Sequence, residues 1–349
     1  MNTTAYATPN SRTLPVRVCP IGLMESDAME SFMSWASRLA WSNGYRSIQR
    51  LLGAEGFPAA SISSDVGQEE CRRRLVQLAG FDDSLLASLT VRIFPASPND
   101  IQRGAGPGSR WILHRDTTEP GTPHQVCPQC LAAGEVPYWK MNSRRSYVTQ
   151  CAKHGAVLLS HCPECGGQLT ISRTRTAELH QCAICRFDLR CAEDSTLSPA
   201  DQVPQHWTNF DAATPHPCAP GFIEKHAFWA GVKVILDVVC RPAIAMRLLK
   251  VSAIESFHGP IEKVVARPYW SFDHHDVGCR HHLLLFIKWL LEDWDNRVNG
   301  IQSMVDIRSA IKYSRTNYAT WPQEYFRAHS WAAYIPLEVR YARSLVNSA

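Results

Sequence analysis

Apolar residues near the N-terminus recur at helical spacing. Between Asp27 and Trp41 they fall at every third or fourth position, which is the pattern of a helix with one buried face. Ser26 or Asp27 is the expected N-cap, and the Asn43-Gly44 pair, a strong turn signal, is the expected stop. The pattern therefore predicts a first helix that starts at Asp27 and ends at Trp41.

A second, shorter helix is predicted directly after this turn. Residues 47–52 carry apolar side chains on one side, and Gly53 follows them as the expected end. Two helices joined by a tight turn have the outline of a helix-turn-helix. Residues 68–78 and 83–89 carry further helical patterns, so we expect residues 1–95 to form an N-terminal helical, helix-turn-helix-like domain.

Two stretches rich in Pro, Gly and polar residues interrupt the apolar pattern. Residues 96–110 and 196–221 have the composition of linkers, and they bound a cysteine-rich centre at residues 111–195. Helical patterns return over residues 222–349, where we expect a C-terminal all-α domain. The helices predicted in that domain cover residues 222–239, 243–257, 281–296, 302–313 and 337–346.

The composition is that of a globular protein. Hydrophobic residues make up 45% of the 349 residues and charged residues 19%, which argues against a disordered chain, a collagen-like repeat and a simple coiled coil. The longest apolar stretches, residues 229–240 and 283–291, are shorter than the roughly 20 residues that span a bilayer, so we expect no membrane span. Residues 1–13 lack the order of a signal peptide, and we expect a cytoplasmic protein in a reducing compartment.

The positive charges are mostly arginines. The formal net charge is only +4, but 28 Arg stand against 8 Lys. Arginine favours bidentate contacts with phosphates and carboxylates, whereas a high genomic GC content produces the same bias without any such partner. Charge alone therefore leaves nucleic-acid binding open.

The spacing of the thirteen cysteines provides the strongest chemical signal. Seven of them, together with His154, form four closely spaced pairs of candidate metal ligands. The pairs are Cys127 with Cys130, Cys151 with His154, Cys162 with Cys165, and Cys182 with Cys185. Each pair at the tip of a tight turn presents two ligands to one ion, and two pairs complete a tetrahedral shell. The spacing predicts tandem zinc ribbons with two structural zinc ions, one held by three Cys and one His and the other by four Cys.

Other interpretations of the cysteines stay open. Disulfides would require an oxidising compartment, and an iron–sulfur cluster in the four-Cys set would have unusual spacing. His161, His180 and Cys191 are alternative ligands close to the predicted pairs. The remaining cysteines have no partner at ligand spacing and are expected to be small core or surface residues. They are Cys19, Cys71, Cys218, Cys240 and Cys279.

Contacts to DNA or to a protein partner are predicted on the second helix. In a helix-turn-helix this helix would enter the major groove, and its polar face carries Arg46, Gln49 and Arg50. An ordinary solvated face is the alternative. A His-rich cluster at residues 274–282 follows no ligand pattern, so a third metal site is the less favoured interpretation there.

The sequence carries no motif that indicates catalysis. It has no G-x-x-x-x-G-K-[ST] loop, no G-x-S-x-G elbow and no H-E-x-x-H helix. A zinc-dependent hydrolase would need an open coordination position, which the predicted four-ligand sets do not offer. We therefore expect no catalytic residues and no enzymatic activity.

Three blocks of the sequence resemble the TniQ family, which includes TnsD-like proteins. The blocks are Leu14-Pro15-Val16 with Glu30 to Trp35, Arg38 to Ala40 and Asn43-Gly44; Cys127 to Cys130 with Pro137-Tyr138-Trp139; and Cys151 to Gly155 with Leu158-Leu159 and Cys162 to Gly166. They span about half of the chain. The Pro-Tyr-Trp and Cys-x2-His-Gly elements in this order make the resemblance specific, while the C-terminal third has no matching motif.

The resemblance implies a target-selection adaptor of DNA transposition. Such a protein links a target-site recogniser to a AAA+ transposition ATPase, which then recruits the transposase. The recogniser is a guide-RNA effector complex in CRISPR-associated transposons and attachment-site DNA for TnsD-like relatives, and a homodimer is expected. The alternative is a stand-alone, zinc-containing, sequence-specific DNA-binding regulator.

The expected fold is mainly α. It comprises the N-terminal helix-turn-helix-like bundle, tandem zinc ribbons with small β-hairpins, and the C-terminal all-α domain.

Overall fold

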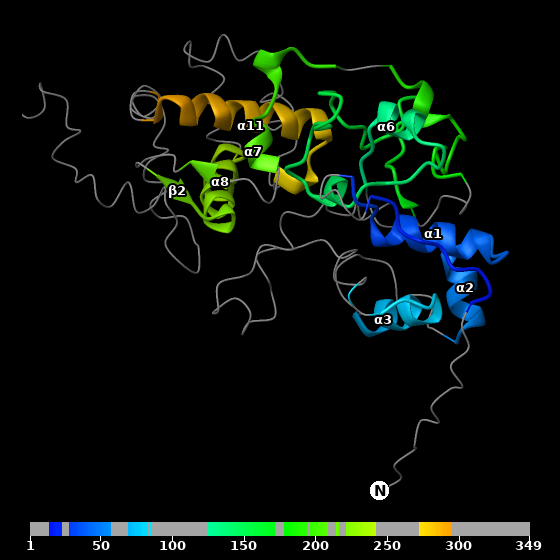
Figure 1. Ribbon diagram of the computed structural model, residues 1–349. Coiled ribbons are helices and arrows are strands. Elements are labelled where there is room, and N and C mark those ends of the chain that lie inside the picture. The colour runs from blue at the N-terminus through cyan, green and yellow to red at the C-terminus, as the bar shows by residue number, and fades with distance from the viewer. Residues whose placement is uncertain are drawn as a thin grey trace, which may run out of the picture. The chain divides into compact units, whose positions relative to one another are not determined.

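The computed structural model is mainly helical, with one small two-stranded sheet among the residues that it describes (Figure 1). The described residues are 14–22, 28–56, 69–82, 84, 124–171, 178–193, 196–208, 214–215, 221–241, 272–294 and 297. The chain divides into two compact units. The first contains residues 1–210 and 273–281, and the second contains residues 211–272 and 282–349.

Helix α1 (Phe32–Ser42) starts later than its apolar pattern predicts. The N-cap is Ser31, whose hydroxyl accepts a hydrogen bond from the Ser34 amide at 3.3 Å, rather than Ser26 or Asp27. The chain just before the cap is occupied elsewhere, because Glu30 forms a β-bridge with Lys140. Met29, the apolar residue just before Glu30, is therefore half-buried without being part of the helix. The predicted end is confirmed by Asn43 as C-cap and Gly44 at φ +80°.

Helix α2 (Ile48–Ala54) follows the turn, with Ser47 as its N-cap. The predicted stop at Gly53 is wrong, because this glycine lies inside the helix. Gly56, at φ +76°, is the residue that adopts the left-handed conformation after the end. Helix α3 (Glu69–Leu78) agrees with its prediction within one residue. The linker predicted at residues 96–110 and most of the helix predicted at residues 83–89 lie outside the described residues.

The helices α1, α2 and α3, blue to cyan in Figure 1, share one hydrophobic core with the cysteine-rich region. Phe32, Trp35 and Leu51 from the helices are fully buried in it. Trp139 and Leu189 from the cysteine-rich region belong to the same cluster. In the described part of the first unit, the helices are therefore not an independently packed bundle.

The cysteine-rich region is built mainly from turns. Its elements are helix α6 (Pro128–Ala133) and the short 3-10 helices η2 (Asn142–Arg144) and η4 (Leu189–Cys191). The predicted β-hairpins are reduced to isolated bridges, such as Val126 with Leu159 and His161 with Gln168. Ladders do not extend because each chain segment turns away to bring its cysteines together.

Residues 196–208, predicted as part of a linker, pack against the cysteine-rich region. They carry the 3-10 helix η5 (Pro199–Asp201) and helix α7 (Gln205–Thr208). Gln150 Nε2 donates to the Val203 carbonyl at 2.8 Å, and Gln150 Oε1 accepts from the Val203 amide at 2.9 Å. Val203 and Trp207 are buried, so this proline-containing stretch is not a free linker.

Residues 273–281 join the first unit through a fully buried arginine. The Arg280 guanidinium donates to the backbone oxygens of His275 and Ser146 and, at 2.9 Å, to Gln125 Oε1. Burial lowers the pKa of Arg280 to about 10. These bonds supply the acceptors that a buried cation needs.

The second unit contributes a strand pair and helices. Strands β1 (Thr214–Pro215) and β2 (Phe222–Ile223) pair antiparallel, and helix α8 (Lys225–Val239) follows them. The helix predicted from residue 222 thus begins three residues later, because its first residues pair with β1. Further elements are the 3-10 helix η7 (Phe272–His274) and helix α11 (Val277–Glu292), which begins in the first unit.

Helix α11 begins four residues before the predicted start at residue 281. The Asp276 carboxylate accepts the amide of Cys279 at 2.9 Å and so supplies an N-terminal cap that the apolar pattern does not mark. The helices predicted at 243–257, 302–313 and 337–346 lie outside the described residues. Among the described helices, none combines the length and the apolar character needed to cross a membrane.

Candidate metal centres

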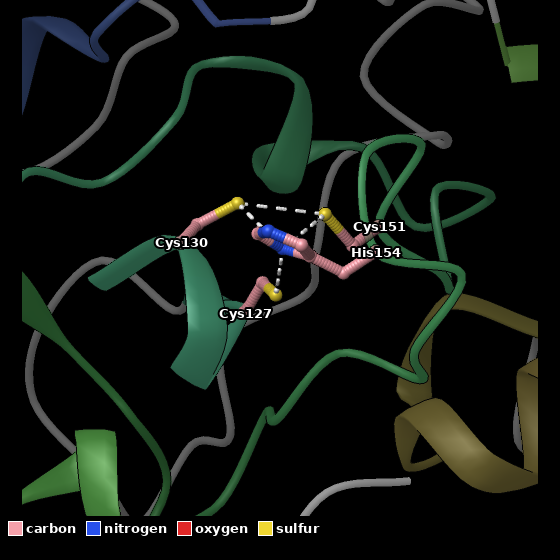
Figure 2. Close-up of side chains that lie close together, drawn as sticks. All are labelled: Cys127, Cys130, Cys151 and His154. Atoms are coloured by element: carbon pink, nitrogen blue, oxygen red, sulfur yellow. Dashed lines mark hydrogen bonds between the residues drawn. The ribbon is translucent and has the colours of Figure 1, made fainter. Parts of the chain in front are cut away.

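The first cluster consists of Cys127, Cys130, Cys151 and His154, whose ligand atoms point toward one common point (Figure 2). Cys127 is the N-cap of α6 and Cys130 lies in its first turn, so the helix start presents both sulfurs on one side. His154 Nδ1 lies 3.3, 3.4 and 3.6 Å from the three sulfurs of Cys127, Cys130 and Cys151. Cys130 Sγ lies 3.5 Å from Cys151 Sγ.

These separations fit a tetrahedral metal shell. With metal–sulfur bonds of about 2.3 Å and metal–nitrogen bonds of about 2.0–2.1 Å, the edges of a tetrahedron are about 3.6–3.8 Å long. The four atoms of the first cluster lie close to that spacing without an ion. A soft set of three sulfurs and one imidazole nitrogen suits zinc and leaves no position for water.

The second cluster consists of Cys162, Cys165, Cys182 and Cys185. Cys162 Sγ lies 3.5 Å from Cys185 Sγ, and Cys165 Sγ lies 3.7 Å from Cys182 Sγ. In each cluster all four ligand atoms lie within 4.8 Å of one another. The two clusters can therefore each hold one metal ion, as the spacing of the four pairs predicts.

Three of the four pairs share one backbone geometry. The amide of the first cysteine in each pair donates to the carbonyl five residues later, and the residue four positions later donates back to the carbonyl of that cysteine. That later residue is left-handed in all three turns, and it is Gly155, Gly166 or Arg186, at φ +63°, +69° and +69°. The pair Cys127 and Cys130 is the exception, because it starts a helix rather than sitting on a tight turn.

The surroundings of the first cluster favour the thiolate at Cys151, whereas the pKa values of Cys127 and Cys130 are raised. Hydrogen bonds from the thiols of Cys127 and Cys130 lower the pKa of Cys151, against the effect of burial. The pKa of Lys140 is raised by the thiolates of Cys130 and Cys151 despite the opposing effect of desolvation. Lys140 thus places a cation beside a shell whose three thiolates exceed the charge of a divalent ion.

The alternative ligands do not join either cluster. His161 Nδ1 lies 3.0 Å from the hydroxyl of the preceding Ser160, and Cys191 is an exposed free thiol. In the His-rich segment, both ring nitrogens of His281 are already engaged, by Thr149 Oγ1 at 3.0 Å and by the Asp201 carbonyl at 2.9 Å. Among the described residues, only the two clusters bring three or more potential ligands together.

The remaining cysteines are dispersed. Cys240 and Cys279 are buried and Cys19 is exposed, in line with their expected roles as core or surface residues. The side chain of Cys71 and all of Cys218 lie outside the described residues.

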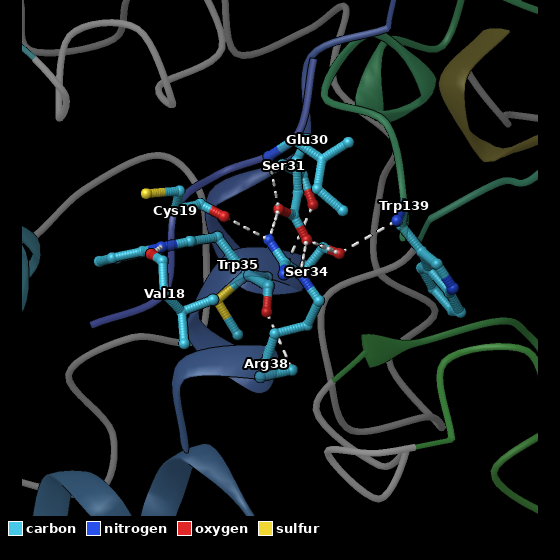
Figure 3. Close-up of polar contacts among 11 residues, drawn as sticks. Val18, Cys19, Glu30, Ser31, Ser34, Trp35, Arg38 and Trp139 are labelled. Carbon is cyan, nitrogen blue, oxygen red and sulfur yellow. Dashed lines mark hydrogen bonds and ion pairs between the residues drawn. The ribbon is translucent and has the colours of Figure 1, made fainter. Parts of the chain in front are cut away.

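A polar network, which the spacing of the sequence does not indicate, ties α1 to the cysteine-rich region (Figure 3). The buried Glu30 carboxylate accepts two hydrogen bonds from Arg38, at 2.8 and 2.5 Å, and one from Ser34 Oγ at 2.7 Å. Ser34 Oγ in turn accepts the Trp139 amide at 3.0 Å, and the Ser31 amide donates to the Trp139 carbonyl at 2.8 Å. The first turn of α1 is thereby fixed onto the strand-like segment around Trp139.

A cavity of about 490 Å³ borders the first cluster. The cysteines of that cluster, Lys140 and Lys153 are among the residues that line it. The residues predicted to contact DNA or a partner, Arg46, Gln49 and Arg50, lie elsewhere, in and just before α2, and all three are exposed. The structure therefore does not bring them together with the metal clusters.

The fold and the two clusters define a mainly helical protein with two Cys-rich clusters that could each hold a metal ion. Within that class, residues 22–158 match the model of the TniQ family, so the resemblance seen in the sequence motifs is confirmed. The match includes α1, α2 and the first cluster and ends before the second. It supports a general role in target selection during DNA transposition, in a family of non-catalytic accessory proteins. A search of curated proteins found no match.

Proposed function

We propose that the protein is a target-selection adaptor of DNA transposition, which links a target-site recogniser to a AAA+ transposition ATPase. The recogniser is a guide-RNA effector complex or attachment-site DNA. The adaptor acts in the cytoplasm at the DNA, as a homodimer, and has no catalytic residues of its own. The match of residues 22–158 to the TniQ family is the observation that carries this proposal.

Two zinc ions complete the proposed protein, one in each cluster. The first is held by Cys127, Cys130, Cys151 and His154, and the second by Cys162, Cys165, Cys182 and Cys185. Thiolate and imidazole donors at tetrahedral spacing favour zinc, and a closed shell gives the ion a structural task. The metal then adds to the stability that the shared hydrophobic core gives this turn-rich region.

An adaptor needs surfaces held at a fixed distance, and the contacts of the first unit are suited to that task. The Glu30 network and the common core join α1 and α2 to the cysteine-rich region. A partner bound at α2 would therefore be held rigidly relative to the first metal centre. The exposed Arg46, Gln49 and Arg50 are the proposed contacts to DNA or to a protein partner.

The test is a binding measurement with the purified, zinc-loaded protein. The cognate AAA+ ATPase and a target complex are offered separately and together in biolayer interferometry. The proposal expects binding to each and a ternary complex with both. Binding to neither would reject it.

One observation favours the alternative of a stand-alone, sequence-specific DNA-binding regulator. Two arginines and a glutamine lie exposed in and just before the helix that would occupy a major groove. Fluorescence anisotropy on specific and scrambled duplexes across a salt series separates the two functions. A self-sufficient reader keeps a preference of about a thousandfold or more, whereas an adaptor that takes its target from a partner binds weakly, without preference, and loses affinity steeply with salt.

A further inference from the structure

The second cluster lies half in the core and half at the surface. Cys162 and Cys182 are only 1% and 2% exposed and belong to the hydrophobic cluster that contains Phe32 and Leu51 of the N-terminal helices. The other two ligands, Cys165 and Cys185, are exposed. A metal bound here would connect solvent-accessible sulfurs directly to the core beneath α1 and α2.

The first cluster is placed differently. Cys127 and Cys151 are 5% exposed, and neither belongs to the core cluster that holds the N-terminal helices. A cavity borders these sulfurs, but their low exposure limits direct attack from bulk solvent. The two centres thus differ in access, because two ligands of the second cluster are exposed and none of the first cluster is.

A short chain of hydrogen bonds leads from the second cluster to α1. Leu179, three residues before Cys182, accepts the indole N–H of Trp139 at 2.7 Å. Trp139 is 1% exposed, and its backbone amide and carbonyl bond Ser34 and Ser31 at the start of α1 (Figure 3). The indole is therefore held by the segment of the second cluster on one side, while its backbone holds α1 on the other.

We propose that the second cluster is a metal-dependent, oxidation-sensitive switch that controls the order of the first turns of α1. The inference rests on the proposed metal occupancy. While the metal is bound, the segment before Cys182 is fixed and Trp139 is clamped between it and α1. When the metal leaves, that segment loosens, Trp139 loses its indole acceptor, and the start of α1 becomes mobile. The adaptor surface on α2 would then no longer be held in place.

Hydrogen peroxide is the oxidant that the exposed thiolates would meet. Cys165 Sγ attacks one oxygen of the peroxide, the O–O bond breaks, and hydroxide leaves and takes up a proton to become water, which gives a sulfenic acid. Cys182 Sγ, 3.7 Å away, attacks that sulfur, and the second hydroxide leaves and is protonated to water as the disulfide forms. Two electrons pass from the two sulfurs to the peroxide. The metal loses two of its four ligands and leaves as a divalent cation.

The test combines metal counting with hydrogen exchange on the full-length, zinc-loaded chain. Peroxide, or in a parallel arm a zinc chelator, is added in steps until one equivalent of metal is released. We expect this first equivalent to coincide with several-fold faster exchange in peptides covering residues 178–189 and 31–38, while residues 124–130 and 148–158 stay protected. Simultaneous loss of both metals, earlier loss from the first cluster, or unchanged exchange in α1 would overturn the proposal.

Two matched variants refine the test. Cys165→Ser removes one ligand of the second cluster, so the purified variant should hold about one metal ion and should already show the faster exchange at residues 178–189 and 31–38 without peroxide. Cys130→Ser makes the same change in the first cluster and should leave peroxide-driven loosening of α1 intact. If Cys165→Ser does not fold, the wild-type titration alone still decides. The readouts involve neither the ATPase nor DNA, so failure of the switch and failure of the adaptor function are distinguishable.

Discussion

Glu30 is the residue on which the contact between α1 and the cysteine-rich region depends most. Its side chain is fully buried, and its two carboxylate oxygens accept from Arg38, from Ser34 and from the Ile21 amide. A buried carboxylate is stable only when its oxygens are satisfied in this way. The carboxylate therefore fixes the helix start and the segment before it at the same time.

Glu30→Ala should lower the free energy of unfolding by about 1–3 kcal/mol, because it leaves the half-buried Arg38 guanidinium with the Cys19 carbonyl but without its carboxylate partner. Urea unfolding at fixed zinc concentration, followed by circular dichroism, measures the change. The matched control is Glu178→Ala, which breaks the half-exposed ion pair with Arg186 and should cost less than about 1 kcal/mol. Equal costs for the two variants would contradict this role of Glu30.

The buried His124 should make the free energy of unfolding depend on pH. Burial, with a further contribution from the charge of Arg144, lowers the pKa of His124 well below its usual range. The folded protein keeps this imidazole neutral while the unfolded chain takes up a proton, so the free energy of unfolding falls as the pH drops below about 6.5. Protonation of the metal ligands acts in the same direction, so a variant is needed to isolate the contribution of His124.

His124→Gln should reduce the slope of the unfolding free energy between pH 7 and 5 by up to about 1.4 kcal/mol per pH unit, which corresponds to one proton. Glutamine can retain a donor for the Lys140 carbonyl, which lies 2.8 Å from His124 Nε2. The comparison with wild type is made by urea unfolding at each pH in excess zinc. Identical slopes would show that His124 is not kept neutral.

At the scale of elements, the turns that carry the ligand pairs depend on a left-handed residue. Gly166 is at φ +69° with no atom near its missing Cβ, so Gly166→Ala is penalised by backbone conformation alone. It should lower the free energy of unfolding by about 1–2 kcal/mol. Gly53, inside α2 and equally unobstructed, is the matched control, and Gly53→Ala should raise it by about 0.5–1 kcal/mol. Equilibrium unfolding of both variants measures the sign of the change in the free energy of unfolding. A change of the same sign in the two variants would contradict the argument.

The sequence predicts the elements well where the signal is local. Helix α3 and the turn at Asn43-Gly44 follow from helical periodicity and turn chemistry, and both agree with the structure. The predicted start of α1 is wrong because a long-range bridge to Lys140 holds Glu30 in extended backbone, which periodicity cannot register. Gly53 does not end α2 because the cost of one exposed glycine is smaller than the gain from continuing the helix to Ala54.

For the whole molecule, the metal clusters are the part of the site that spacing alone predicts. Two ligands three residues apart fit one turn, and two such pairs fit one ion, so all eight residues of the two clusters follow from the sequence. The Trp139–Ser34 contact joins residues 105 positions apart, and no local pattern marks it. Gly155 and Gly166, which follow two of the pairs, indicate the shared left-handed turn in the sequence. Arg186 occupies the same position in the third turn, and an arginine gives no such indication.

Metal stoichiometry follows from these two clusters. The purified protein should contain two zinc ions per chain by plasma mass spectrometry, and Cys127→Ser and Cys162→Ser should each lower the content toward one. Because four-ligand zinc sites supply folding free energy, full removal by a chelator should also lower the unfolding midpoint. Unchanged content in both variants would exclude these residues as ligands.

The central claim, that the protein selects the target of transposition, is tested most directly by mapping insertion sites in a reconstituted reaction. The cognate transposase, AAA+ ATPase and target complex are combined with donor and target DNA, with and without the zinc-loaded protein. The account predicts insertions concentrated at the chosen site when the protein is present, and scattered or absent insertions when it is omitted. An identical insertion profile in both reactions would contradict it.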